Sequence, residues 1–320
     1  MKRSQFRRLM DILLRTLGRQ TRRTIAQYGV PVTDAQRVEV ATALLPHIQR
    51  ARLQSHALGV QLLEAQAEAL DMPVPEVAPV RPYERQAVVT VLENVTRVQP
   101  PQRTGPSVTV TDDNEIPDDA PRVSVTVLDP VTRRDSRVTV EVTEDNRRDP
   151  AVVKVISDRV VSVAERHARM PSREAVTDTV ESDEVAELGE VIGFARVLTG
   201  AESCGFCAML ASRGPTFKEK PTVGPVSREA ASAFFVSSRS KRYDANELKA
   251  YHNNCDCEVV LVREGEDWPG MDQYDALERL WIDVTDGKRL SAEGARKAFA
   301  KRFREEVANG NGGRFVPDVD

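Results

Sequence analysis

The stretch YHNNCDCEVVLV, residues 251–262, places one histidine and two cysteines directly before a run of apolar residues. The whole chain of 320 residues contains four cysteines and four histidines. The other two cysteines form a second close pair earlier in the chain, in ESCGFCAML, residues 202–210. The cysteines therefore fall into two clusters, and their spacing indicates a shared purpose.

The spacing of the cysteines favours a metal site. Cys255 and Cys257 are two positions apart, so in a strand their side chains point to the same face of a sheet. Cys204 and Cys207 have the C-x-x-C spacing of a turn that runs into a helix. Structural zinc sites commonly join two such pairs and take four sulfur or nitrogen ligands. We expect a zinc site that uses four of the five candidate ligands, Cys204, Cys207, His252, Cys255 and Cys257.

Two alternatives for the cysteines remain open. Disulfide bonds among Cys204, Cys207, Cys255 and Cys257 would form if the protein ends in an oxidising medium. A redox-active pair of the thioredoxin type at Cys204 and Cys207 is the other alternative, although no clear βαβ pattern surrounds it. A chain made in the cytoplasm favours metal-binding thiolates over disulfides.

The first 149 residues divide into two sections. Residues 1–72 carry apolar residues at helical spacing and predict a helical region, with its second helix broken at Pro46. Residues 73–149 begin with a proline-rich connector and a short helix near residues 83–96, and valine then alternates with polar residues. The alternation predicts three strands, either as a small β-module or as a segment that becomes ordered in an assembly. Their valines are Val108/Val110, Val123/Val125/Val127 and Val138/Val140/Val142.

The remaining chain is predicted as a helical domain that holds the Cys/His cluster, residues 150–308, and a flexible tail, residues 309–320. An amphipathic helix is expected to begin at Pro150 and a second helix at about Ser172, and two more helices are expected late in the chain. The predicted fold class is therefore α+β, mostly helical, with a valine-rich β insertion and a small C-terminal domain joined by the Cys/His cluster.

Charge and hydropathy limit the classes of function. The net charge is −4, which argues against nucleic-acid binding by bulk electrostatics. Residues 1–23 nevertheless contain eight basic residues and one acidic residue, which suit either a solvated helix face or a contact with packaged DNA. The candidate DNA contacts are Arg7, Arg8, Arg15, Arg19, Arg22 and Arg23. The sequence shows neither a membrane-spanning run nor a signal peptide, so we expect synthesis in the cytoplasm and no membrane partner.

The segment GFARVLTGAESCGFCAMLASRGPTF, residues 193–217, followed by YHNNCDCEVVLV, resembles the carboxy-terminal domain of Mu F-like minor head proteins of tailed bacteriophages. It is most similar to the branch found in phages of actinobacteria. The resemblance covers about residues 190–262 and extends more weakly to the helical N-terminus and to residues 268–281, whereas residues 100–150 are not a feature of the family.

The resemblance implies a Mu F-like C-terminal domain and a minor capsid protein that acts in head morphogenesis without catalysis. Such a protein binds the portal protein and the scaffold or major capsid protein. It would be made in the host cytoplasm, enter the procapsid and lie inside the virion head, near the portal.

Two other functions are alternatives. A capsid maturation protease would need a catalytic motif, but the sequence contains neither G-x-S-x-G nor H-E-x-x-H. His252 lies near thiols and leaves a Cys/His dyad as a candidate, whereas the other histidines, His47, His56 and His167, fall in predicted helices. A zinc-knuckle nucleic-acid-binding protein would have the right ligands, but it also needs arginines and aromatic residues around them. Near the cluster only SSRSKRY, residues 237–243, is basic. The prediction leans towards an assembly protein rather than an enzyme.

Overall fold

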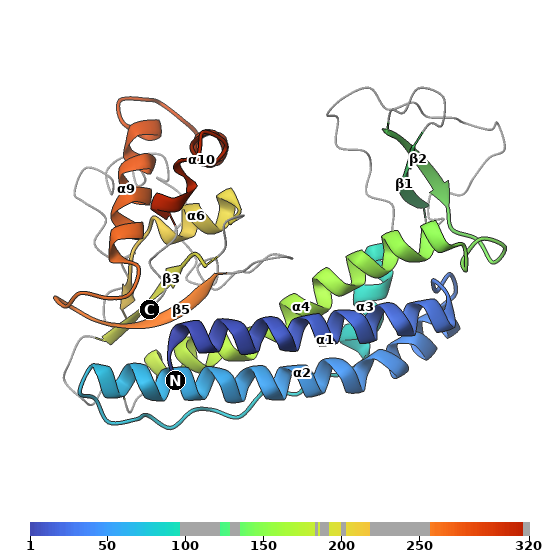
Figure 1. Cartoon of the computed structure of the whole chain (residues 1–320), viewed down its shortest axis with the longest axis horizontal. Helices are drawn as coiled ribbons and strands as arrows, with labels where there is room; N and C mark the ends of the chain where they lie inside the picture. The colour runs from blue at the N-terminus through green and yellow to red at the C-terminus, as the bar shows by residue number, and fades with distance from the viewer. Residues whose placement is uncertain are drawn as a thin grey trace. The chain divides into compact units, whose positions relative to one another are not determined.

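The computed structural model describes residues 1–96, 122–128, 135–182, 185, 192–199, 203–217 and 257–315. The chain forms two compact units, each assembled from separate stretches of sequence. Unit 1 consists of Met1–Met10, Ser55–Val80 and Arg169–Asp320, and unit 2 consists of Asp11–Gln54 and Arg81–Ala168. Three long helices contribute residues to both units: α1 (Arg3–Tyr28), α2 (Asp34–Ala69) and α4 (Pro150–Val180) (Figure 1).

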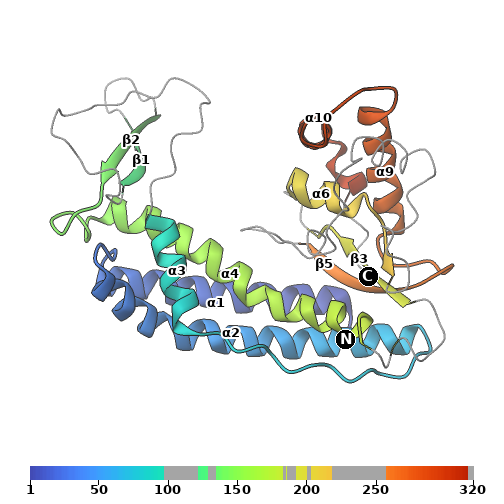
Figure 2. The same ribbon diagram turned by 180° about the vertical axis from the view of Figure 1, so that it is seen from behind.

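Unit 2 is a bundle of helices. The parts of α1, α2 and α4 that belong to it lie side by side, and α3 (Arg85–Thr96) packs with them (Figures 1 and 2). Each helix buries one apolar stripe, as the helical spacing predicts. The buried residues include Leu14, Leu17, Ile25, Val40, Leu44, Ile48, Val88, Leu92, Val152, Ile156 and Val160.

Two expectations about these helices are wrong in detail. The helix α2 runs through Pro46 without a break, and α4 runs through Pro171, where a second helix was expected to start at about Ser172. A proline inside a helix costs about 3 kcal/mol. Burial of a large aliphatic side chain stabilises by about 1.5–3 kcal/mol, so a few buried residues such as Leu44 and Ile48 near Pro46 offset that cost.

The buried face of α1 also differs from the sequence pattern. Leu9 and Ile12 fit a helical apolar spacing, but their exposed fractions are 37% and 53%. Phe6, Met10 and Leu14 are buried instead, at intervals of four residues. Because apolar residues lie on more than one side of this helix, periodicity alone does not select the buried side.

The valine-rich section contains a β-hairpin. β1 (Arg122–Leu128) pairs antiparallel with β2 (Asp135–Glu141), and Val123 is opposite Val140. These are two of the three predicted strands. The third, with Val108 and Val110, lies outside the described residues, and the proline-rich connector before α3 has no regular secondary structure, as predicted.

Unit 1 is built around a three-stranded antiparallel sheet. Its strand order is β4 (Thr216–Phe217), β3 (Ile192–Val197) and β5 (Glu258–Arg263). Alternate residues face opposite sides of the sheet. One side packs on α2 and α4 residues through Phe194, Val259 and Leu261. The other side has its own cluster: Ala195, Val197, Val260, Val262, Trp268 and Tyr274.

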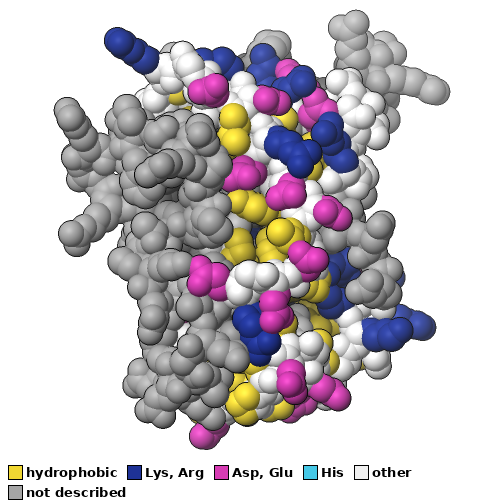
Figure 3. Space-filling model, turned by 90° about the vertical axis from the view of Figure 1, so that its left-hand side faces the viewer, with side chains coloured by type: hydrophobic (Ala, Val, Ile, Leu, Met, Phe, Trp, Pro, Cys, Tyr) yellow, Lys and Arg dark blue, Asp and Glu magenta, His cyan; other side chains and the backbone are white. Residues whose placement is uncertain are grey.

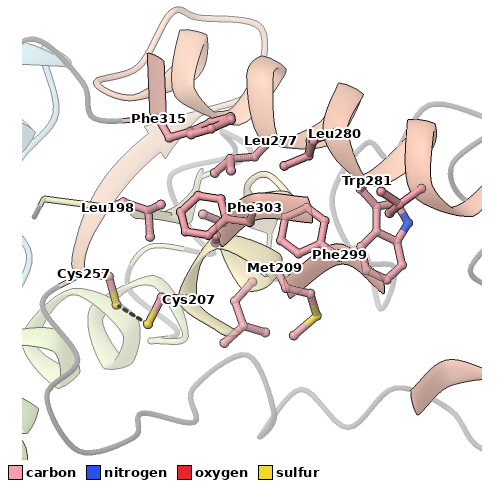
Figure 4. Packing of buried hydrophobic residues seen from close by; sticks show 14 of the residues in the cluster. Leu198, Cys207, Met209, Cys257, Leu277, Leu280, Trp281, Phe299, Phe303 and Phe315 are labelled. Atoms are coloured by element: carbon pink, nitrogen blue, oxygen red, sulfur yellow. Dashed lines mark hydrogen bonds between the residues drawn. The ribbon is translucent and has the colours of Figure 1, made fainter. Parts of the chain in front are cut away.

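An aromatic core joins the last helices of unit 1. Trp281 lies on α9 (Met271–Thr285), and Phe299 and Phe303 lie on α10 (Ala292–Ala308) (Figure 4). The short helix α6 (Gly205–Ala211) packs against both helices through Met209 and its neighbours. Both late helices were predicted from the sequence, and the fold is mostly helical α+β, as expected.

The end of the described chain is ordered. Residues 311–315 form the 3-10 helix η1 (Asn311–Phe315), although the sequence predicts a flexible tail from residue 309. Phe315 is buried and its ring centroid lies 5.2 Å from that of Phe303. The side-chain amide of Gln273 donates to the carbonyl oxygen of Phe315. An aromatic anchor within a glycine-rich segment accounts for this order.

Candidate functional site

The C-x-x-C pair lies at the start of α6, as its spacing predicts. Cys204 is the N-cap residue, and its Sγ accepts a hydrogen bond from the backbone N–H of Cys207 at 3.3 Å. The glycine between them is required by packing, since a Cβ on Gly205 would lie 2.8 Å from the Cβ of Ala300 on α10. The positions of Cys204 and Cys207 are thus fixed by the close contact between α6 and α10.

The two cysteine clusters meet in space. Cys257 directly precedes β5, and its Sγ lies 3.9 Å from the Sγ of Cys207, fifty positions earlier in the chain (Figure 4). Both residues are buried, with exposed fractions of 0% for Cys207 and 2% for Cys257. The predicted convergence of the two clusters is therefore present for these two residues.

The distance between these sulfurs identifies what the pair can do. A disulfide bond requires about 2.05 Å between sulfur atoms. Two thiolates on a tetrahedral zinc ion, each about 2.3 Å from the metal, lie about 3.8 Å apart. The observed 3.9 Å fits two ligands of such a centre and also fits a pair of hydrogen-bonded thiols.

Two buried arginines fix Cys257. Arg173 of α4 donates from Nε and Nη2 to the carbonyl oxygen of Cys257, at 3.2 Å and 2.9 Å. Arg196 of β3 donates from Nη1 to the Sγ of Cys257 at 3.4 Å. The exposed fractions of these arginines are 4% for Arg173 and 7% for Arg196. Main chain and sulfur of Cys257 are therefore held by separate guanidinium groups.

The neighbouring residue, Glu258, forms a buried ion cluster with the start of α1. Arg7 donates from Nε to one carboxylate oxygen at 2.7 Å and from Nη2 to the other at 3.2 Å. Arg3, one turn earlier, reaches the same carboxylate at 3.2 Å. The side chain of Glu258 is 5% exposed, so the carboxylate needs cationic partners to be stable there.

The sequence pattern does not indicate these arginine roles. It presents Arg7 as a candidate DNA contact, and Arg196 only as one residue of the segment that resembles Mu F-like proteins. One available signal is Glu258 itself, an acidic residue directly before four apolar residues, Val259 to Val262. A second signal was the four-residue spacing of Arg3 and Arg7, which puts both on one helix face.

The five predicted metal ligands are only partly described. Cys204, Cys207 and Cys257 lie in the described ranges, whereas His252 and Cys255 lie outside them. Within those ranges, no three His, Cys, Asp or Glu side chains are close enough together to hold a metal ion. The zinc site thus stays a prediction, with one sulfur–sulfur contact that fits it.

The other histidines lie in helices, as expected. His167 of α4 accepts a hydrogen bond at Nε2 from Arg166, at 2.9 Å, and packs edge-on against Tyr83. Arg52 donates to its carbonyl oxygen at 2.9 Å. Burial, followed by the charges of Arg166 and Arg52, lowers the pKa of His167 to about 4. This histidine is neutral at neutral pH and is part of the packing of unit 2.

The motif ASRG of residues 211–214 is explained by packing. Arg213 is buried, and its guanidinium carbon lies 3.9 Å from the ring centroid of Trp281. Gly214 has a φ of +71° and lies against Tyr274, where a Cβ would be 2.9 Å from a ring carbon. Arg213 therefore packs on the aromatic core, and Gly214 packs on Tyr274 of the cluster on the sheet.

The basic N-terminal residues are partly paired within the chain. Arg15 forms an exposed ion pair with Asp11 at 2.7 Å, and Arg22 pairs with Asp158 at 3.0 Å. On the face drawn in Figure 3, acidic and basic side chains are interspersed over the coloured residues, with hydrophobic side chains between them. No described helix has both the length and the apolar character needed to cross a membrane.

The fold and the thiol pair define a mostly helical α+β protein in which a buried cysteine directly precedes a strand of the sheet and contacts two arginines. The sequence then identifies the family: the chain belongs to the family described as VG15 protein, whose model matches residues 2–284. No solved structure matches the chain.

Two curated relatives come from bacteriophages. The Gene 15 protein of Mycobacterium phage L5 is 29% identical over 168 residues, which cover 48% of this chain and 56% of that relative. The Gene 15 protein of Mycobacterium phage D29 is 31% identical over 154 residues, which cover 45% and 54%. The chain thus spans about half the length of the curated relatives it matches, and it is a bacteriophage protein.

Proposed function

We propose that this protein is a minor capsid protein of the Mu F-like kind and acts in phage head morphogenesis. The observation that carries the proposal is membership of a phage family over residues 2–284, with relatives in two mycobacteriophages. The segment that resembles Mu F-like proteins, about residues 190–262, contains both cysteines of the buried pair. A structural role also agrees with the way ASRG is used in packing.

We further propose the partners and location that follow from this role. The protein would bind the portal protein and the scaffold or major capsid protein in the host cytoplasm, and then stay in the virion, inside the head near the portal. Contacts with packaged DNA would use the basic N-terminal residues, of which Arg7, Arg15 and Arg22 already pair with acidic residues of the chain. DNA binding by the remaining charges would weaken steeply with salt.

Zinc is the proposed structural ion of the cysteine cluster. The 3.9 Å between the sulfurs of Cys207 and Cys257 fits two thiolate ligands, and the arginine beside Cys257 suits a negatively charged sulfur. The remaining ligands would come from Cys204, His252 and Cys255. Bound there, a zinc ion would supply cross-linking of distant segments rather than chemistry.

The experiment is made in a phage that encodes this protein. Cys207→Ser and Cys257→Ser are expected to give heads that are absent, unstable or non-infectious, with cleavage of the major capsid protein unchanged. Lys297→Ala, which removes one partner of an exposed ion pair on α10, is the control and should form normal heads.

Two results would contradict the proposal. Normal infectious heads from a phage that lacks the gene would exclude a role in morphogenesis. Heads that contain uncleaved capsid precursor in the cysteine variants would instead favour a capsid maturation protease with a cysteine nucleophile.

A further inference from the structure

The solvent side of α2 in unit 2 carries few charges. A helix that buries one apolar stripe normally has charged residues on its solvent side. On α10 seven of the nine exposed residues are charged: Glu293, Arg296, Lys297, Lys301, Arg302, Arg304 and Glu305. On α2 only two of the eight exposed residues between positions 35 and 53 are charged. We call these eight residues the outer face of α2: Ala35, Val38, Glu39, Thr42, Pro46, Gln49, Arg50 and Leu53.

The uncharged residues of the outer face form a row along the helix. Leu53 is 61% exposed and Val38 is 39% exposed. At 3.6 residues per turn, five uncharged residues fall within an arc of about 80° and extend over about 22 Å of helix: Val38, Thr42, Pro46, Gln49 and Leu53. A single exposed leucine is ordinary, whereas a continuous uncharged row is the pattern of a helix that packs on another helix.

The polar side chains in this row already have hydrogen bonds within the chain. The hydroxyl of Thr42 donates to the carbonyl oxygen of Val38 at 2.7 Å. The side-chain amide of Gln49 donates to the carbonyl oxygen of Tyr83 at 3.0 Å. Pro46 adds an uncharged ring and has no backbone N–H to be desolvated. A partner can therefore cover the row while these hydrogen bonds persist.

The two charged residues of the outer face indicate which partner fits. Glu39 and Arg50 lie on the same flank of the row, about 20° and 40° beyond Pro46. The ion pair at the start of α2 joins Asp34 to Arg37, and both Glu39 and Arg50 are exposed. The flank thus presents one negative and one positive charge, eleven positions apart along the helix.

This pattern is complementary to itself. When two copies of α2 pair antiparallel about a two-fold axis between positions 45 and 46, Val38 of each copy faces Leu53 of the other, and Thr42 faces Gln49. A two-fold axis keeps the same flank of both helices on the same side. Glu39 then lies two positions from the residue that faces Arg50 of the other copy, a shift of about 3 Å along the helix.

We propose that the outer face of α2 is a self-association surface, on which a second copy of this chain docks with its own α2 antiparallel. Contacts between Val38 and Leu53 close both ends of the interface, and two Glu39–Arg50 pairs set its direction. Parallel pairing would place like charges together and is disfavoured. One helix pair is small against the standard interface of about 1,600 Å², so the dimer forms reversibly with a Kd in the micromolar range.

The test measures self-association of the purified full chain by sedimentation velocity over a series of protein concentrations. The wild type is expected to change from monomer to dimer as the concentration rises. Leu53→Ser is expected to raise the Kd about 10-fold or more, since a two-fold dimer loses each apolar contact twice. Met271→Ser is the matched control, because Met271 of α9 is 38% exposed but lies outside the outer face, and its Kd should be unchanged.

Charge reversal tests the direction of pairing. Glu39→Arg and Arg50→Glu are each expected to raise the Kd about 10-fold, because like charges then face each other. The variant with both reversals should regain the wild-type Kd. An equimolar mixture of the two single variants should also form a dimer, since each variant supplies the charge that the other lacks.

Two outcomes would overturn the proposal. One is a wild-type chain that stays monomeric at every concentration. The other is a dimer whose Kd is the same in the wild type, Leu53→Ser and both charge-reversal variants, because its contact would then lie elsewhere. All three substituted residues are exposed, so circular dichroism should show the same helical content in each variant. If Leu53→Ser changes that content, the charge-reversal variants supply the comparison.

Discussion

Gly59 of α2 lies directly against Ser172 of α4 in unit 1. A Cβ added at Gly59 would be 2.6 Å from the Cα of Ser172 and 2.7 Å from its carbonyl oxygen. Both atoms belong to the backbone and cannot rotate away. The two helices therefore approach each other more closely than any side chain at residue 59 would allow.

Gly59→Ala is expected to destabilise unit 1 by about 1–3 kcal/mol, because overpacking forces the helices apart. The gain in helix propensity, about 1 kcal/mol, acts in the opposite direction. Gly313→Ala is the matched control, since no atom lies within 4 Å of a Cβ there. Urea unfolding measures the stability of both variants. Equal unfolding midpoints would show that the close contact between Gly59 and Ser172 does not contribute to stability.

Glu258→Gln is expected to destabilise the chain strongly because it removes the charge of a buried carboxylate that pairs with two partly buried arginines, Arg3 and Arg7. Loss of one partner of a buried ion pair typically costs about 3–5 kcal/mol. The control is Asp11→Asn, which breaks a pair whose side chains are 76% and 53% exposed and should cost at most about 1 kcal/mol. Chemical unfolding measures the free energy of unfolding of both variants. An equal loss of stability in Glu258→Gln and Asp11→Asn would refute the prediction.

Local patterns in the sequence predict most of the elements. Helical spacing finds α1, α2, α9 and α10, and valine alternation finds the β1–β2 hairpin. Pro46 and Pro171 mislead because the rule for proline describes an isolated helix, whereas buried neighbours outweigh the local cost here. Local rules therefore identify elements well and predict their ends less reliably.

The candidate site is predictable only in part, for a different reason. The C-x-x-C and C-x-C spacings indicate that Cys207 and Cys257 converge, and these two sulfurs do lie together. The arginines that contact Cys257 and Glu258 come from distant positions in the chain; Arg7, for example, lies 251 positions from Glu258. A single sequence contains no local pattern that encodes such a pairing, so a buried acidic residue shows only that some cation must be near.

Acidification should weaken unit 2 through His167. An unfolded histidine titrates near pH 6.5, whereas the native pKa of His167 is about 4, lowered first by burial and then by Arg166 and Arg52. Above pH 6.5 both states are neutral and the stabilisation is fully present. Between pH 6.5 and 4 the unfolded chain binds the proton and the native chain does not, so stability falls as pH falls.

The expected loss over this window is about 1–2 kcal/mol, less than the full linkage because part of the ring is exposed to solvent. Thermal unfolding from pH 7 to pH 4 measures it. His167→Gln keeps the carbonyl oxygen that accepts from Arg52 and should show a flatter pH dependence in the same window. An unchanged slope in this variant would mean that other groups cause the acid sensitivity.

Phe315→Ala tests whether the end of the described chain is part of the core of unit 1. Phe315 is 2% exposed and contacts Phe303, and its carbonyl oxygen accepts from Gln273, so removal of the ring leaves a cavity beside α9 and α10. Truncation of a buried phenylalanine costs about 3–5 kcal/mol. Arg314→Ala, whose side chain is 56% exposed, is the neighbouring control and should change stability by less than about 1 kcal/mol. Trp281 belongs to this core, so urea unfolding followed by tryptophan fluorescence measures the stability of both variants. Equal stability of the two variants would mean that residues 311–315 are not part of the core and belong to the flexible tail that the sequence predicts.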